Sequence, residues 1–502
     1  MSAGAGAAMA VDDGLEVSGG VGGIGARMED MRTAAGLLRD CAHDLRAATV
    51  AVGRVLADPG LLGSAVVGPV TFAGVQRALA AALGGPTGLV PAAARTEALG
   101  AALLTATATY AAAEAGGVRL MRGVDLAVGR YAGRLAALGL LAALPQVVGG
   151  AVVTRLLPVR ATGPRGGPAA ADEGAPGGLG PSLAGLLARG GDGTEHLVAA
   201  APGALQGLLA PVPALGTAWG LAADTGWPPR TLPDASALLV TLAGTAGLLR
   251  EPGRVTTRPA APRTGAVPAG VGDLAGLVES SYPSGGGASG AVRVTRVDAP
   301  GGRRAWVVAI PGTQVWDPRT GGNPLDVTSD VHSLAGRRTA AAATVVDAMR
   351  TAGVRPGEPV CLVGHSLGGM VAAGLAGDPG VRARFRVDEV VTLGAPAATY
   401  PVPRDVGVLS LEHIDDLVPR LDGVRNPDRS DWVTVRRSLT PPGATPDVLA
   451  THDVGGYVRT AALVDASHDP SLIAARARLA PFLATAGATA TTVEVTGSRV
   501  LP

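Results

Sequence analysis

The segment from Cys361 to Met370 reads CLVGHSLGGM and holds the residues best suited to chemistry in this 502-residue chain. Apolar residues typical of a strand precede Ser366, and small residues compatible with a helix follow it. A serine in the sharp turn between a strand and a helix needs small neighbours two positions away on each side, and Gly364 and Gly368 occupy those positions. Ser366 is therefore the predicted nucleophile.

A serine hydroxyl attacks a carbonyl carbon efficiently only when an imidazole takes its proton and a carboxylate orients that imidazole. The stretch 409–419 reads LSLEHIDDLVP, which predicts a strand followed by an acidic loop. Asp415 and Asp416 lie in that loop, so both are candidates for the orienting acid. The predicted base is His452, which lies beyond the next predicted strand, and His468 is the alternative.

The negative charge that forms on a substrate oxygen during such an attack needs hydrogen-bond donors. One predicted donor is the backbone amide of Leu367, the residue after the nucleophile. A second is expected from the loop 311–314, which follows a predicted strand over residues 306–310. His365 is expected to pack beside the site or to orient other groups in it.

Five ordered segments between residues 290 and 465 resemble the class 3 lipases of the α/β-hydrolase superfamily. They are residues 311–314, 361–370, 394–396, 409–419 and 451–457. In that family the acid is the aspartate of a D-[IL]-V-P segment, so the resemblance implies Asp416 as the acid. A Gly-Ser/Thr pair in the family's oxyanion loop similarly implies Thr313 as the second donor. A tyrosine also follows the histidine of these lipases by a few residues, as Tyr457 follows His452 here.

The resulting interpretation is a serine hydrolase that cleaves carboxylic esters through an acyl-enzyme, with an ester or a lipid as substrate and no cofactor. Thioester cleavage and acyl transfer would use the same residues. The alternative is a noncatalytic secreted or envelope-associated scaffold that binds acyl groups or partner proteins. The presence of a nucleophile, a base, an acid and oxyanion donors favours the enzyme.

The composition indicates which kinds of partner the chain can bind and which kinds of element can position these residues. Apolar residues make up 47% of the chain and aromatic residues only 3%, which favours tightly packed helices of Ala, Val and Leu. A net charge of +1, with no cluster of Arg and aromatic residues, argues against a nucleic-acid partner. Cys41 and Cys361 lie in separate predicted regions and outside any CxxC pattern, so we expect neither a disulfide framework nor a metal site.

The spacing of apolar residues predicts an all-α N-terminal region followed by an α/β domain with a mostly parallel sheet and flanking helices. A long amphipathic helix is predicted from Ile24 to Leu56, and a second helical stretch from Phe72 to Ala115, broken near Gly84, would complete a hairpin. The predicted regions are a helical region over 1–158, a Pro/Gly-rich linker over 159–181, a second helical segment over 182–251, a linker over 252–270 and the α/β-hydrolase domain over 271–502.

The predicted hairpin ends in a tyrosine and a carboxylate one helical turn apart, Tyr110 and Glu114. This pair resembles the YxxxD/E signal that follows the helical hairpin in substrates of the type VII secretion system. The resemblance implies export, with the secretion machinery or a helical partner binding the hairpin. A departure is that Leu61–Ser64 stands where those proteins have Trp-x-Gly. The alternative is that Tyr110 is a plain core aromatic residue.

The N-terminus has neither the basic start nor the apolar run of a general secretory signal, so we expect that route not to be used. The type VII resemblance favours an exported or cell-envelope protein, and the alternative is the cytoplasm. Residues 135–154 carry no charge and are long enough to cross a bilayer, but Pro145, Gln146 and two glycines interrupt them. A buried or surface-lying helix is therefore favoured over a membrane span.

Overall fold

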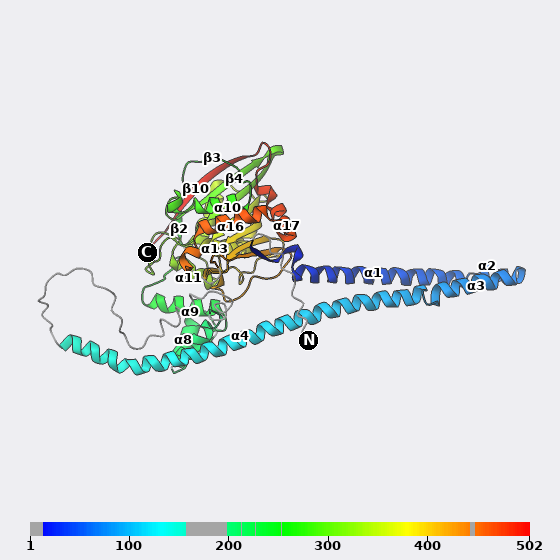
Figure 1. Cartoon of the computed structure of the whole chain (residues 1–502), viewed down its shortest axis with the longest axis horizontal. Helices are drawn as coiled ribbons and strands as arrows, with labels where there is room; N and C mark the ends of the chain where they lie inside the picture. Colours follow the sequence, from blue (N-terminus) through cyan, green and yellow to red (C-terminus); the bar gives the residue numbers. More distant parts are fainter. Residues whose placement is uncertain are drawn as a thin grey trace. The chain divides into compact units, whose positions relative to one another are not determined.

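The computed structural model describes residues 14–156, 198–211, 213–225, 227–252, 254–441 and 447–501 (Figure 1). Side chains are not described over 138–156 or at residues 215, 448 and 449. The chain divides into two compact units, one of Gly23–Met121 and one of Met1–Gly22 with Arg122–Pro502. The predicted linker over 159–181 lies outside the described residues.

The second unit contains a mixed sheet whose order is β1-β9-β8-β7-β6-β5-β4-β10-β2, with β3 also paired to β10. Strands β5 to β9 run parallel, and antiparallel strands flank them on both sides. The strands are β1 (Leu15–Gly19), β2 (Val255–Pro259), β3 (Arg263–Gly265), β4 (Ala291–Ala299), β5 (Arg303–Ile310), β6 (Pro359–His365), β7 (Arg386–Leu393), β8 (Gly407–His413), β9 (Trp432–Arg437) and β10 (Thr489–Arg499).

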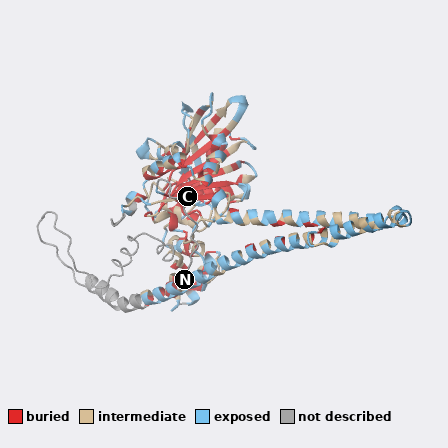
Figure 2. Cartoon of the chain, turned by 45° about the vertical axis from the view of Figure 1, so that its right-hand side comes forward, coloured by how far each residue is buried: buried red, intermediate tan, exposed pale blue. Residues whose placement is uncertain are grey.

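Helices cover both faces of this sheet. Successive residues of a strand point to opposite faces, so each helical layer contacts a different set of strand side chains. Val308 and Leu362 pack with one layer, formed by α12 (Ala340–Ala352) and α13 (Leu367–Gly377). Val307 and Cys361 pack with the other layer. That layer is formed by α10 (Val271–Glu279), α16 (Val454–Ala466) and α17 (Pro470–Leu479). The buried residues concentrate in the sheet between these layers (Figure 2), which confirms the predicted α/β fold preceded by a helical region.

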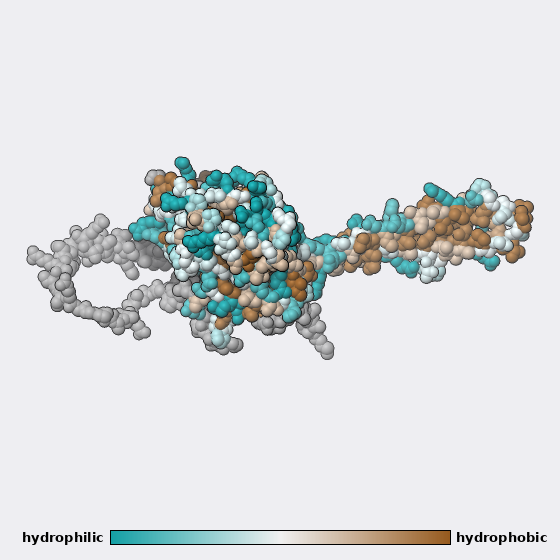
Figure 3. Space-filling view, turned by 90° about the horizontal axis from the view of Figure 1, so that it is seen from above, coloured by the Kyte–Doolittle hydropathy of each residue, from teal (hydrophilic) through white to brown (hydrophobic). Residues whose placement is uncertain are grey.

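The unit of Gly23–Met121 is helical. Its elements are α1 (Ile24–Leu56), α2 (Pro59–Val67), α3 (Pro69–Gly84) and the first part of α4 (Leu89–Leu156). Helix α1 has the predicted bounds and lies beside α3, as in a hairpin. Many apolar side chains on this unit are exposed (Figure 3). The predicted end of the second helix at Ala115 is wrong, because α4 continues through Gly116 and Gly117.

Three strands lie outside the domain predicted over 271–502. Strand β1 falls in the region predicted to be helical, and β2 and β3 fall in the predicted linker over 252–270, so both predictions are wrong for these residues. Each strand has only three to five residues, too few for a clear alternation of apolar and polar side chains. Their partners are distant in sequence, because Leu15 pairs with Arg437 and Thr257 pairs with Gly497.

The predicted second helical segment is present as α7 (Ala201–Leu209), α8 (Pro213–Ala222) and α9 (Leu232–Thr245). Helix α7 crosses α4 so closely that Cβ atoms would not fit at either side. A Cβ on Gly129 would lie 2.0 Å from the carbonyl oxygen of Ala200, and one on Gly203 would lie 2.3 Å from that of Leu126. Glycine therefore permits this helix crossing.

Helix α9 packs against α11 (Val327–Leu334), a helix of the α/β domain. A buried cluster of charged side chains holds the segment that follows α9 close to α11. The Arg499 guanidinium at the end of β10 donates to Glu251 at 3.0 Å and to Asp326 at 2.8 Å. Asp326 in turn caps the N-terminus of α11. These contacts join the second helical segment, the last strand and α11.

Among the described residues, no single helix has the length and apolar composition needed to cross a membrane. The pair α1 and α2, bent by 44° at their junction, passes the same test together. The membrane-span alternative over residues 135–154 falls within α4, and its side chains from residue 138 onward are outside the described part.

Candidate active site

Ser366 occupies the turn between β6 and α13, with φ 54° and ψ −122°. This left-handed conformation is costly for a residue with a side chain and is characteristic of a strained turn. The turn is tight. A Cβ on Gly364 would lie 2.1 Å from the carbonyl oxygen of Gly368, and one on Gly368 would lie 2.1 Å from that of Ile310. The close approach of backbone atoms therefore leaves no room for a Cβ at positions 364 and 368, which explains the two glycines of the motif.

Asp416 and His452 are held together by a short hydrogen bond. His452 Nδ1 donates to Asp416 Oδ2 at 2.6 Å, and the Tyr457 hydroxyl donates to the same oxygen at 2.7 Å. The backbone amide of Val418 donates to Oδ1 at 2.9 Å, so the fully buried carboxylate has three donors. Because Nδ1 carries the shared proton, Nε2 is the basic nitrogen of His452.

The alternative acid and base lie in other surroundings. Asp415 Oδ2 accepts hydrogen bonds from the Ser438 hydroxyl and from the amides of Leu439 and Thr440, each at about 3 Å. Its carboxylate therefore closes the loop after β9. His468 is exposed between α16 and α17. The structure thus pairs Asp416 with His452 and leaves the two alternatives outside that pair.

The base and the nucleophile are connected through His365, the neighbour of Ser366. The ring centroids of His365 and His452 lie 4.6 Å apart, and His365 Nε2 lies 3.0 Å from the carbonyl oxygen of His452. Within the described residues, no hydrogen bond joins Ser366 Oγ to His452, and the recorded contacts of the His452 side of the site run to His365. Catalytic hydrogen bonds are often long before substrate binds.

Tyr282 joins His365 to the oxyanion loop, a contact that the sequence gave no reason to expect. Its hydroxyl lies 2.6 Å from His365 Nδ1 and accepts the Gly312 amide at 2.5 Å. A carbonyl can only accept, so His365 Nε2 carries the proton that it donates to His452. Burial holds the pKa of His365 well below its usual range, which keeps the ring neutral. Nδ1 therefore accepts from the Tyr282 hydroxyl.

The predicted oxyanion residues belong to two segments, the start of α13 and the loop after β5. Leu367 is the first residue of α13, so its amide has no partner within the helix. The loop after β5 abuts the nucleophile, since a Cβ on Gly312 would lie 2.8 Å from the Cβ of Ser366. The Thr313 hydroxyl donates to Asp330 Oδ2 at 2.6 Å, which commits its proton to that carboxylate. The backbone amide is then the group of Thr313 suited to a substrate oxygen.

Asp330, on α11, is a second carboxyl near the candidate base and was not identified from the sequence. Burial raises its pKa to about 7, opposed by the hydrogen bond from Thr313. Its charge and that of His452 also influence each other electrostatically. Its proton occupancy therefore changes near neutral pH, at the edge of the candidate site.

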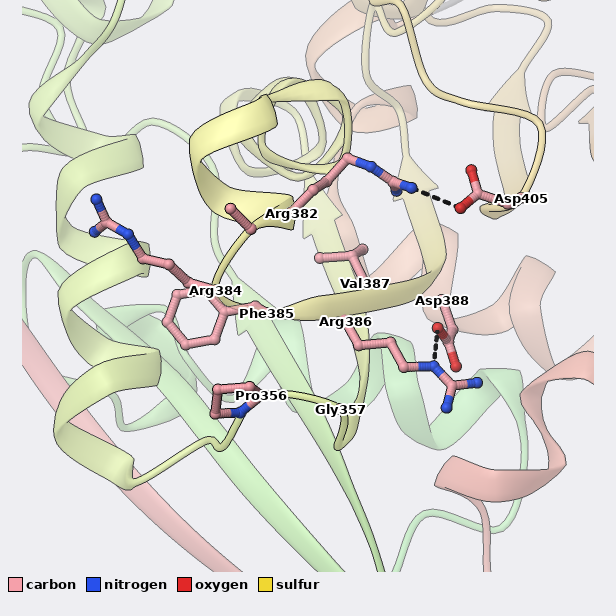
Figure 4. Close-up of a pocket in the computed structure, with 10 residues that line it drawn as sticks. Pro356, Gly357, Arg382, Arg384, Phe385, Arg386, Val387, Asp388 and Asp405 are labelled. Atoms are coloured by element: carbon pink, nitrogen blue, oxygen red, sulfur yellow. Dashed lines mark hydrogen bonds and ion pairs between the residues drawn. The ribbon is translucent and has the colours of Figure 1, made fainter.

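A cavity of about 480 Å³ lies elsewhere in the domain (Figure 4). It is lined by residues before β6 and β8 and by residues before and at the start of β7, whereas Ser366 follows the end of β6. The seven residues of β6 separate the two places by about 20 Å. Arg382 pairs with Asp405 and Arg386 pairs with Asp388 at its edge. This cavity is not part of the candidate active site.

The predicted export pair lies in the other unit. Tyr110 is 45% exposed, so the alternative that it is a core aromatic residue is wrong. Glu114 is exposed one turn later on α4. The pair stands within a continuous helix and not at its end. Among the described residues, no group of three or more His, Cys, Asp or Glu side chains could hold a metal ion.

Comparison with known proteins agrees with this fold. Residues 336–425 match the family described as the PGAP1-like alpha/beta domain. The matched segment includes Ser366, Leu367 and Asp416 and ends before His452. The comparisons with curated proteins and with solved structures found no match. Residues 336–425 are therefore similar to PGAP1-like domains, which have an α/β-hydrolase type of fold, as predicted for this part of the chain.

Proposed function

We propose that the α/β domain hydrolyses carboxylic esters, with Ser366 as the nucleophile, His452 as the base and Asp416 as the acid that orients it. The observation that carries the proposal is the 2.6 Å hydrogen bond between His452 and Asp416, together with a serine in a strained turn whose chain neighbour His365 contacts His452. A positioned imidazole beside a serine hydroxyl is the arrangement that serine hydrolases use.

The proposed reaction has two halves. His452 Nε2 takes the Ser366 proton as Oγ forms a bond to the ester carbonyl carbon, and the carbonyl oxygen becomes negatively charged. The Leu367 and Thr313 amides stabilise that oxygen. His452 then returns the proton to the departing alcohol, which leaves an acyl-enzyme. Water, deprotonated by the same imidazole, releases the carboxylic acid and restores Ser366.

Two other chemical outcomes use the same groups. A thioester would lose a thiol in the first half, and an acyltransferase would replace water by an alcohol in the second. A noncatalytic acyl-binding scaffold would have no need of the carboxylate that orients His452. The buried Asp416, with three donors around it, favours a reactive base over a binding role.

Labelling with a fluorophosphonate probe tests the enzyme proposal. The full chain should form an adduct on Ser366, and Ser366→Ala should form none. Ser64→Ala, at an exposed serine of α2, is the matched control and should label like the wild type. Absence of an adduct on the wild type would overturn the proposal. A panel of p-nitrophenyl esters of increasing acyl length then defines the substrate class.

We also propose that Tyr110 and Glu114 direct export through a type VII pathway. Both side chains are exposed and one helical turn apart on α4, so a partner can reach them together. In an actinobacterial host with such a pathway, Tyr110→Ala should remove the protein from the culture filtrate, whereas Tyr131→Ala, at another exposed tyrosine of α4, should not. Equal secretion of wild type and Tyr110→Ala would refute this role.

A further inference from the structure

The junction of α2 and α3 exposes an unusual concentration of apolar side chains. Residues 59–76, called here the apolar tip, contain no charged side chain and stand between Asp58 and Arg77. Val66, Val67 and Val70 are 89%, 91% and 84% exposed. Apolar side chains accordingly dominate the end of the helical unit at the right of Figure 3. Exposed clusters of this kind mark sites that bind an apolar partner.

The exposed side chains do not share one face. Val66 and Val67 are consecutive in α2 and point about 100° apart around the helix axis. Neither α2 nor α3 contains a buried residue. A helix or a flat protein surface docking on one side would leave part of this set in water. An apolar medium that surrounds the tip would cover all of it.

Two hydrogen bonds within the chain involve side chains at or beside the tip. The Ser64 hydroxyl donates to the carbonyl oxygen of Leu61 at 2.6 Å. The Asp58 carboxylate caps α2 by accepting the Leu61 amide at 3.0 Å. These hydrogen bonds lower the cost of moving the tip out of water. Arg54, at the end of α1, and Arg77, within α3, supply positive charge on the two chain segments that lead away from it.

We propose that the apolar tip inserts into the surface of an anionic lipid bilayer. The nine residues of α2 are too few to span a bilayer, which takes about 20 helical residues, so the tip would lie within the interface. Arg77 follows Val70 by seven residues, which sets its charge back by about 10 Å along α3. At that depth the long side chains of Arg54 and Arg77 reach anionic head groups while the valines contact acyl chains.

Vesicle sedimentation tests this inference on the full chain. Every protein carries Ser366→Ala, so that lipid hydrolysis does not affect the result and binding is separated from the proposed esterase activity. The probe is a vesicle of phosphatidylglycerol and phosphatidylcholine, compared with phosphatidylcholine alone. The test variant is Val66→Asp with Val67→Asp. The matched control is Leu120→Asp with Met121→Asp, another adjacent exposed apolar pair in the same unit, far along α4.

We expect binding to anionic vesicles, weaker binding to neutral ones, and a loss of about tenfold or more in partitioning for the tip variant, because charged side chains are costly among acyl chains. The control should bind like the wild type, and circular dichroism should show equal helix content in all three. Failure of the parent protein to bind, or equal binding by the tip variant, overturns the inference. Tip-dependent dimerisation without vesicle binding would instead assign the tip to a second copy of the chain.

Discussion

The carboxylate of Asp416 determines how His452 can act. With Nδ1 donating to Oδ2 and Tyr457 donating to the same oxygen, the imidazole has one orientation and one tautomer. In the proposed reaction, an imidazolium formed on His452 would lie 2.6 Å from this buried carboxylate. The carboxylate that fixes the ring would then also face the positive charge that the ring acquires.

Asp416→Asn should lower kcat for a p-nitrophenyl ester by roughly 10³-fold to 10⁴-fold with little change in KM, because an amide favours the wrong tautomer of His452. Steady-state kinetics measure this effect. Asp415→Asn serves as the control, since Asp415 bonds the loop of residues 438–440, and it should retain activity if folded. A reversed pattern would make Asp415 the acid.

Tyr282→Phe should lower kcat by roughly 10-fold to 100-fold, a range seen when supporting hydrogen bonds are removed from other sites. The change removes the hydrogen-bond partner of both the Gly312 amide and His365 Nδ1. The oxyanion loop and the His365 ring that contacts His452 should then be held less firmly. KM should change little, because Tyr282 acts by positioning. Tyr400→Phe, which loses only a bond to the Ser333 carbonyl, is the matched control. Equal kcat values for the two variants would contradict the positioning role.

Asp330 should make stability depend on pH. Its folded pKa, about 7, is above the ordinary value of 3.8, so the folded chain holds the proton more tightly than the unfolded chain. Its contribution to stability is therefore full below about pH 4 and is lost as pH rises through 7. Urea unfolding between pH 4 and 8 should show a smaller loss in Asp330→Asn than in the wild type and in Asp347→Asn, because Glu389, whose pKa is also raised to about 7, contributes equally in all three. Parallel profiles for all three would contradict this assignment.

At the residue scale, the sequence identified the groups that belong to a local motif. Ser366 was predicted from glycines two positions away, Asp416 from the resemblance of its segment to class 3 lipases, and His452 from its place after the next predicted strand. Tyr282 and Asp330 contact Gly312 and Thr313 across 30 and 17 positions, from elements whose packing determines the contact. No residue spacing encodes such a contact, so sequence alone could not have found them.

Helix packing at the α4–α7 crossing depends on glycines that look unremarkable in a chain with 75 of them. At this crossing a side-chain carbon would meet backbone atoms, which cannot move aside as a flexible side chain can. Packing therefore requires glycine at positions 129 and 203, while many other glycines of the chain face open space.

Gly203→Val should lower the free energy of unfolding by about 1–3 kcal/mol, the usual cost of forcing extra carbons into a packed contact. Thermal unfolding followed by circular dichroism measures the loss. Gly244→Ala is the control, because its added carbon meets nothing within 4 Å, and it should be neutral or slightly stabilising. Equal effects of the two changes would show that the crossing does not limit stability.

At the scale of elements, long periodic segments were predicted well and short or interrupted ones were not. The bounds of α1 follow directly from its amphipathic pattern, which ends before Asp58 and Pro59. The continuation of α4 was missed, because a glycine pair weakens a helix without being able to end it. Strands β1, β2 and β3 owe their conformation to partners far along the chain, so their own residues carry little signal.

For the whole molecule, the α/β domain is assembled from both ends of the sequence. Strand β1 forms one edge of the sheet beside β9, with Leu15 buried among the residues of α17 and the strands. At the other edge β2 and β3 pair with β10, and Glu251 meets Arg499 there. A fragment limited to the predicted domain 271–502 lacks β1, β2, β3 and Glu251.

Leu15→Ala should destabilise the α/β domain by about 2–5 kcal/mol, as for other buried leucines. Urea unfolding of the full chain, monitored by tryptophan fluorescence, measures the change. Glu16→Ala, the next residue on the same strand, is the control, because its partly exposed side chain is 3.9 Å from Arg436 and such pairs contribute little. Equal stability of both variants would mean that β1 is not integral to the sheet.

The pairing of Leu15–Gly19 with residues 433–437 also has a consequence for biosynthesis. During translation the first strand leaves the ribosome more than 400 residues before its partner exists. It must remain unpaired while α1 to α4 and most of the sheet are made, so its docking is among the last steps of folding. We therefore expect the nascent chain to carry β1 as an unpaired strand until β9 has been made, and chaperones would have to protect that strand from aggregation.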